Sequence, residues 1–206
     1  MPKAAHFEIL VEEPSMESFL GLVLPKILGS DITFSIHAYQ GKHDLFKKLS
    51  SRLRGYAQWL PADHRIVVLV DRDDDNCAEL KARMERASAD AGLRSRAISG
   101  TTQWNLVNRI AIEELEAWFF GDWGAVRRAY PRLPASVANK APYRDSDAIL
   151  GGTWEALERI LKRSGYFEGG LRKVEFAQAV GREFDHGSCV SYSFTVFHDA
   201  LVEAVG

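Results

Sequence analysis

Acidic residues follow two short apolar segments of this sequence, at the point where each segment ends. Glu12 comes directly after His6–Val11, and a second group begins with Asp71 and Asp73 directly after Ile66–Val70. If both segments are strands of one parallel sheet, their carboxyl ends meet at one edge, which is where such sheets bind ligands. Clustered carboxylates repel one another unless a cation neutralises them, and Mg²⁺ and Mn²⁺ prefer such oxygen ligands. The sequence therefore predicts a site for Mg²⁺ or Mn²⁺ formed by Glu12, Asp71 and Asp73.

A purely structural role is the alternative for the second acidic group. Acidic runs after strands often form solvated turns, and Asp74 or Asp75 could cap a helix that begins near Cys77. The aspartates next to the strand would then only shape the turn. The presence of Glu12 after another strand favours the metal site, while capping is the favoured role for Asp75 alone.

Two known metal-binding patterns fit the acidic run less well. An EF-hand loop starting at Asp71 needs Gly at its sixth position and Glu at its twelfth, where this chain has Asn76 and Ala82. A phosphatase of the haloacid dehalogenase type also has an Asp-x-Asp pair after a strand, but it is normally the first strand of the core. Here two predicted strands and two predicted helices precede the pair, which argues against that class.

The elements that must position these residues alternate along the first hundred residues. Four segments are apolar or β-branched in the manner of strands, namely His6–Val11, Ile32–Tyr39, Ile66–Val70 and Leu93–Ile98. Three segments with helical apolar spacing separate them, namely Met16–Leu28, Leu45–Leu60 and Cys77–Ala91. This alternation predicts an α/β fold with a mostly parallel sheet flanked by helices on both faces.

The second half of the chain changes character. Five segments have helical periodicity, namely Ile110–Phe120, Gly124–Ala129, Thr153–Leu161, Leu171–Val180 and Phe194–Val205. No clear linker separates the halves. We therefore expect an α/β core over residues 1–104 and a helical lobe over residues 105–206, packed together as one compact domain.

Composition limits the classes of protein that fit. The chain has 206 residues, 46% of them hydrophobic, and a formal net charge of −2, so it lacks the overall basic charge of many nucleic-acid binders. Any contact with nucleic acid should then be local or need a partner. Its two cysteines are far apart, and it shows neither a signal sequence nor a membrane-spanning apolar stretch. We expect a cytoplasmic protein without membrane association; the sequence does not indicate its oligomeric state.

Two motifs carry a resemblance to a known fold family. The segment ILVEEPSMESFL, residues 9–20, resembles the first motif of Toprim domains, and VLVDRDDDN, residues 68–76, resembles the second. The order and separation of the motifs also fit, and the resemblance covers about residues 6–100. One departure is Glu13, which stands where Toprim domains usually have Gly, a residue with greater backbone freedom.

The second half resembles a narrower, Toprim-related family of unknown function, DUF4276. The matching segments are RIAIEELEAWFFGD (109–122), KVEFA (173–177) and SYSFTVF (191–197). Related proteins include defence-associated nucleases that act beside an ATPase. The resemblance implies metal-dependent phosphodiester chemistry, with nucleic acid as the substrate and an ATPase as a candidate partner.

The resemblance also implies roles for individual residues. Glu12 matches the Toprim glutamate, a general acid/base and metal ligand, while Asp71 and Asp73 match the metal-binding pair. Glu17 and Asp75 are candidate outer ligands. Glu116 is a further candidate carboxylate, although it could instead be a solvated position on a helix.

Two functions from different classes follow from these patterns. The leading hypothesis is a Mg²⁺- or Mn²⁺-dependent nuclease or related phosphoesterase. The alternative is a binding subunit without catalysis, which keeps the fold and recognises nucleic acid or an ATPase. The mild acidity of the chain and the Gly replacement at Glu13 are compatible with that alternative.

Overall fold

A parallel sheet forms the centre of the computed structural model, which describes residues 2–100 and 103–206. Within these residues its strands are β1 (His6–Val11), β2 (Thr33–Ala38), β3 (His64–Asp71) and β4 (Leu106–Ala111), in the order β2-β1-β3-β4. Every neighbouring pair is parallel. The predicted neighbours β1 and β3 are therefore adjacent, and their carboxyl ends lie at one edge.

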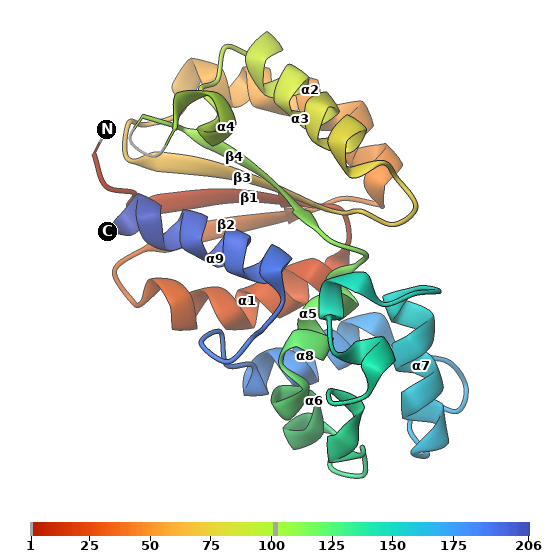
Figure 1. Ribbon diagram of the computed structural model, residues 1–206. Helices are drawn as coiled ribbons and strands as arrows, with labels where there is room; N and C mark the ends of the chain where they lie inside the picture. Colours follow the sequence, from red (N-terminus) through yellow and green to blue (C-terminus); the bar gives the residue numbers. More distant parts are fainter. Residues whose placement is uncertain (1, 101–102) are drawn as a thin grey trace.

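Helices cover both faces of the sheet (Figure 1). On one face lie α2 (Lys42–Trp59) and α3 (Cys77–Asp90), and on the other lie α1 (Pro14–Leu28) and α9 (Tyr192–Val205). Alternate residues of the strands divide between two apolar clusters. Val67 and Leu69 of β3 pack on the α1 and α9 side, whereas Val68 and Val70 pack against α2 and α3. A strand buried on both faces explains the continuous apolar run that the sequence shows there.

Helices that follow β4 in the chain form a lobe beyond its carboxyl end (Figure 1). They are α5 (Leu115–Gly121), α6 (Trp123–Ala129), α7 (Thr153–Arg163) and α8 (Lys173–Glu183), with 3-10 turns at Ala135–Val137, Ala141–Tyr143 and Ser146–Ala148. The lobe is joined tightly to the core through α1 and α8. A Cβ on Gly181 of α8 would lie 3.2 Å from Leu22, and Lys26 donates to the carbonyls of Gly181, Arg182 and Phe184. The predicted α/β fold with a helical C-terminal region is confirmed.

The predicted fourth strand was wrong in position. Leu93–Ile98 contributes only a single bridge, between Ser95 and Leu106, followed by the short helix α4 (Arg96–Ser99). The strand is β4, which lies after residue 104, and the predicted helix Ile110–Phe120 begins only at Leu115. The strand β4 could not be recognised from its sequence, because it contains polar residues whose partners come from elsewhere in the fold. Asn108 donates to Ser88, and Arg109 donates to the carbonyl of Val196.

None of the helices in residues 2–100 and 103–206 combines the length and the apolar character needed to cross a membrane.

Candidate metal centre

Three carboxylates meet at the carboxyl edge of the sheet. Glu12 follows β1 directly, Asp71 is the last residue of β3, and Asp73 lies two residues further on. Because β1 and β3 pair in parallel, with Val11 opposite Leu69, the two strands deliver these side chains to one place. One potential ligand atom from each of the three residues lies within 4.8 Å of the other two. We call this group the three-carboxylate cluster.

Two members of the cluster, Glu12 and Asp71, are buried, whereas Asp73 is exposed. Glu12 is 7% exposed and Asp71 is 4% exposed, and Oε2 of Glu12 and Oδ1 of Asp71 are buried without a hydrogen-bond partner. Burial, together with the charge of Asp73, raises the pKa of Glu12 to about 7. Burial, and next the charge of Glu12, holds the pKa of Asp71 well above its ordinary value. These oxygens therefore lack the compensation that buried carboxylates normally have, and an oxygen-seeking cation would supply it.

The loop after β3 is held in an unusual backbone conformation. Asp73 has a φ of +49°, in the left-handed region that non-glycine residues seldom adopt. Its N–H donates to the carbonyl of Glu113 at 2.8 Å, and the N–H of Arg72 donates to the carbonyl of Ala111 at 2.9 Å. Arg72 also forms an ion pair with the Glu113 side chain. The loop after β4 thus fixes the loop that carries Asp73, as expected where local strain serves a site.

Glu13 needs no glycine-like conformation in this fold. Its φ of −145° and ψ of 160° lie in the extended region, which any residue adopts. Its carboxylate accepts a hydrogen bond from Ser15 at 2.5 Å and lies 3.6 Å from Lys173 Nζ. The backbone at Glu13 therefore requires none of the conformational freedom that glycine provides.

Lys42 is a site residue that the sequence reasoning missed. Its Nζ donates to Asp73 Oδ2 at 2.7 Å, to Asp75 Oδ2 at 2.8 Å and to the carbonyl of Arg72 at 3.1 Å. Although burial alone lowers it, the pKa of Lys42 is raised by these hydrogen bonds to Asp73 and Asp75. The available signal was its position three residues after the end of the predicted strand Ile32–Tyr39, at the same edge of the sheet.

The turn before Lys42 is tied to the cluster through the backbone. Gly41 has a φ of +91°, which favours glycine, and its N–H donates to the carbonyl of Glu12 at 2.7 Å. Lys42 is the first residue of α2, so this bond places the start of that helix beside the three-carboxylate cluster.

Glu116 is buried rather than solvated. It is 3% exposed, its Oε2 has no hydrogen-bond partner, and burial raises its pKa to about 8. Its charge also contributes to the raised pKa of Asp71, so the two groups are electrostatically coupled. Lys173 counteracts this: burial lowers the pKa of Lys173, but the charges of Glu116, Glu13 and Glu114 raise it overall. The alternative role for Glu116, a solvated position on a helix, is therefore wrong.

The remaining predicted residues lie outside the three-carboxylate cluster. Asp75 pairs with Lys42 instead of capping α3, because Asn76 is the N-cap and accepts from the N–H groups of Ala78 and Glu79. Glu17 is half-buried in the first turn of α1, where its N–H donates to the carbonyl of Glu13.

A pocket of about 400 Å³ opens beside Asp73. Its wall includes Arg72, Glu113, Glu114 and Gly152, from the loops after β3 and β4 and from the segment before α7. Glu114 is fixed there, since it accepts hydrogen bonds from Thr153 Oγ1 and from the N–H of Trp154, both at 2.8 Å. Of the three-carboxylate cluster, Asp73 lines this pocket.

Comparison with known proteins identifies one family. Residues 11–202 match the family described as "Domain of unknown function (DUF4276)", a range that includes the three-carboxylate cluster, Lys42, Glu116 and Lys173. No curated protein and no solved structure matches the chain. The family match spans both the sheet and the helical lobe, and the chain therefore belongs to the DUF4276 family.

Proposed function

We propose that this protein is a Mg²⁺- or Mn²⁺-dependent phosphodiester hydrolase that cleaves nucleic acid. The observation that supports this most is the three-carboxylate cluster, in which Glu12 and Asp71 each keep a buried oxygen without a partner. An order of Glu and then Asp-x-Asp on adjacent parallel strands is also what a Toprim relationship would require, and we include that relationship in the proposal.

The residues present fit a hard divalent cation. Carboxylate oxygens of Glu12, Asp71 and Asp73 would hold it, because Mg²⁺ and Mn²⁺ take oxygen ligands. When bound, the cation would neutralise phosphate oxygens and lower the pKa of a water molecule. Asp75 and Glu17 are proposed at most as outer ligands, and Glu116 as an accessory carboxylate next to Asp71.

The protein's own groups have distinct proposed roles. Glu12 is proposed as a metal ligand or, if it does not ligate the metal directly, as a general acid or base, since burial and the charge of Asp73 raise its pKa to about 7 when no cation is bound. Lys42 holds Asp73 and Asp75 in place and brings a positive charge to the position where an anionic phosphate would approach. Arg72 and Glu113 keep the Asp73 loop in its left-handed conformation.

A binding subunit without catalysis is the second candidate. The observation in its favour is Lys42, whose ammonium group already neutralises Asp73 and Asp75, as a site that holds no cation would need. Such a subunit would recognise nucleic acid or assist an ATPase. An ATPase partner is also compatible with the nuclease, so assays should be made with and without any ATPase that copurifies.

Cleavage assays on site variants test the proposal. Purified protein is incubated with plasmid, single-stranded DNA or RNA in Mg²⁺, in Mn²⁺ or in EDTA. Glu12→Gln keeps the side-chain shape but removes proton transfer, which typically contributes about 10²–10⁴-fold to a rate. Asp90→Asn, at the exposed end of α3, is the control. Metal-dependent cleavage that Glu12→Gln abolishes and Asp90→Asn retains supports the nuclease. Wild-type inactivity on every substrate, with and without the partner, favours the binding subunit.

A further inference from the structure

A pocket rich in cationic side chains lies between the end of β2 and α2, the helix that begins at Lys42. It has a volume of about 560 Å³, and its lining includes His37, Tyr39, Lys48, Ser51 and Arg52. The lining contains one carboxylate, that of Asp44, which Lys48 approaches to 2.7 Å. Most of the lining groups are therefore cations or hydrogen-bond donors, in a chain whose net charge is −2. We call this the β2–α2 pocket.

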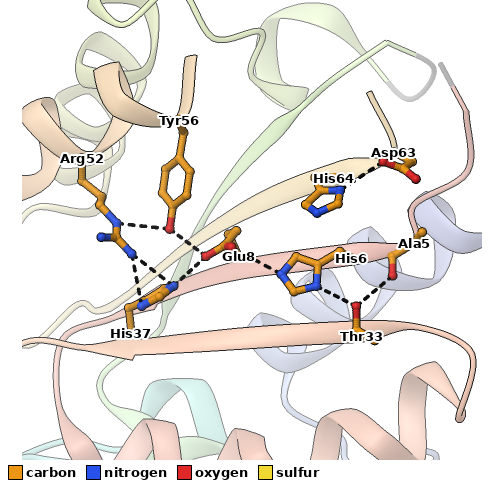
Figure 2. Close-up of polar contacts among 9 residues, drawn as sticks. All are labelled: Ala5, His6, Glu8, Thr33, His37, Arg52, Tyr56, Asp63 and His64. Atoms are coloured by element: carbon orange, nitrogen blue, oxygen red, sulfur yellow. Dashed lines mark hydrogen bonds and ion pairs between the residues drawn. The ribbon is translucent and has the colours of Figure 1, made fainter. Parts of the chain in front are cut away.

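The buried carboxylate of Glu8 holds two of the lining residues in place, His37 directly and Arg52 through Tyr56 (Figure 2). Glu8 of β1 is 9% exposed, and its Oε2 lies 2.6 Å from His37 Nε2 and accepts from the Tyr56 hydroxyl at 2.8 Å. Arg52 in turn donates from Nε to that hydroxyl at 3.2 Å, and its Nη2 lies 3.2 Å from His37 Nδ1. This chain of contacts runs from Glu8 to the guanidinium, so Arg52 and His37 are held in place before any ligand arrives.

The guanidinium keeps donors for a ligand. Its carbon lies 5.0 Å from the centre of the Tyr56 ring, which fixes its plane against α2. Among the described residues, no hydrogen bond involves Arg52 Nη1, and the Lys48 side chain is 56% exposed. Lys48 and Arg52 on successive turns of one helix, with Tyr39 directly after β2, suit the oxygens of phosphate groups.

The pocket adjoins the three-carboxylate cluster along α2. Lys42, at the start of the helix, contacts the cluster, whereas Lys48 and Arg52 lie six and ten residues later. At about 1.5 Å per residue these positions are about 9 Å and 15 Å further along the helix axis. Charges along one strand of B-form nucleic acid rise by about 3.4 Å per nucleotide along the duplex axis and lie further apart along the strand itself, so these separations correspond to a few nucleotides at most.

We propose that the β2–α2 pocket binds backbone phosphates of a nucleic-acid strand, a few nucleotides from the phosphodiester that the three-carboxylate cluster would cleave. This inference rests on the proposed function and adds to it a path for the substrate strand. A passing strand fits better than a small enclosed ligand, because Lys48 and Arg52 lie on the surface of the helix. One strand then contacts Arg52, Lys48, Lys42 and the cluster in turn.

Binding of a fluorescently labelled single-stranded DNA, followed by anisotropy in EDTA, tests the inference. The test variant is Lys48→Gln with Arg52→Gln. The matched control is Lys47→Gln with Arg54→Gln, which removes the same charges from exposed positions of the same helix that do not line the pocket. Each lost contact to a single strand should reduce the salt slope by about 0.7, which corresponds to about five-fold in affinity at 0.1 M salt and about 25-fold for two contacts. A general charge effect would weaken both pairs equally.

A variant that binds the strand more tightly provides a second test, because a folding defect would weaken binding and could not strengthen it. Asp44→Asn removes the carboxylate that competes for Lys48, so it should tighten strand binding, and single Lys48→Gln should weaken it without lowering the melting temperature. Equal binding by the test and control pairs, or no effect of Asp44→Asn, overturns the inference. So does a labelled mononucleotide that binds as tightly as the strand, since the pocket would then hold a free nucleotide.

The two proposals fail in different ways. If the wild-type protein shows metal-dependent cleavage but the test and control pairs bind the strand equally, the β2–α2 pocket does not bind the strand. The proposed function is then unaffected. Absence of strand binding by the wild-type protein, both in EDTA and with Mn²⁺, overturns the inference and counts against a nucleic-acid substrate as well.

Discussion

Lys42 Nζ lies 2.7 Å from Asp73 Oδ2, and this ion pair joins the first residue of α2 to the loop after β3. The lysine side chain is 17% exposed and the aspartate side chain 46%. The pair therefore supplies part of the charge compensation that the three-carboxylate cluster needs. Its effect reaches Glu12, because the charge of Lys42 lowers the pKa of Glu12 while burial and Asp73 raise it.

Lys42→Met should separate stability from metal affinity. Loss of the ammonium leaves Asp73 and Asp75 unpaired in a half-buried site, so the free energy of unfolding in EDTA should fall by about 1–2 kcal/mol. The affinity for Mn²⁺ should rise, because a competing cation has gone, while cleavage should fall. Urea unfolding and calorimetry measure the two effects. Lys162→Met, at an exposed pair with Glu158 on α7, is the control, and equal behaviour of both variants would contradict a site role for Lys42.

Glu116→Gln should change how stability depends on pH. Burial raises the pKa of Glu116 from 4.5 to about 8, so between these values the folded state holds a proton that the unfolded state releases. This contribution to stability is complete below pH 4.5 and is lost as the pH rises through 8, at about 1.4 kcal/mol per unit. Glutamine cannot lose a proton, so the variant should gain about 4 kcal/mol on the wild type between pH 5 and pH 8.

Urea unfolding in EDTA at each pH unit from 5 to 8 measures this difference. The exposed Glu168→Gln is a suitable control, since a solvated carboxylate should not alter the slope. Parallel stability curves for wild type and Glu116→Gln would show that Glu116 is ionised without cost in the folded protein.

The affinity for Mn²⁺ should rise with pH because the cation competes with a proton. Burial and the charge of Asp73 raise the pKa of Glu12 to about 7, and only its carboxylate form can bind a metal. Competition with one proton of that pKa weakens binding about ten-fold at pH 6 relative to pH 8. Calorimetry at both pH values measures the ratio of the two dissociation constants. Glu12→Gln should remove most of the pH dependence that Glu12 causes. A dissociation constant that stays the same across this range would exclude Glu12 as a ligand.

Asn76→Ala should lower stability without affecting the site. The Asn76 side chain accepts from two backbone N–H groups at the start of α3, and loss of such a cap costs about 0.5–2 kcal/mol. Asp75→Asn should cost the helix nothing and act only through Lys42. Thermal unfolding compares the two variants. If Asp75→Asn lowers the stability more than Asn76→Ala and leaves the Mn²⁺ affinity unchanged, Asp75 rather than Asn76 caps α3.

The sequence was informative where one local pattern decides the structure. Ile66–Val70 is apolar throughout and β-branched at every position except Leu69, so both its strand character and its central place could be predicted, together with the edge at which Asp71 lies. The meeting of Glu12 with Asp71 then followed from parallel pairing alone.

Features that depend on distant contacts could not be predicted in this way. The strand β4 contains Asn108 and Arg109, which look like surface residues until Ser88 and Val196 are placed beside them. Glu116 lies in α5, a helix whose residues from Leu115 to Gly121 are all buried because the lobe and the core enclose it. The role of Lys42 likewise depends on distant contacts, because its partners Asp73 and Asp75 come from the loop after β3.

Titration of the metal-free protein with Mn²⁺ at pH 8 tests the central claim most directly. Calorimetry is run on the wild type, on Asp71→Asn and on Asp90→Asn, after urea unfolding has shown that each variant is folded. Asp71→Asn should be at least as stable as the wild type without metal, because it relieves repulsion at a fully buried carboxylate. The account predicts saturable binding by the wild type and by Asp90→Asn that Asp71→Asn loses. Absence of binding by the wild type, or equal binding by Asp71→Asn, would contradict a metal centre at the three-carboxylate cluster.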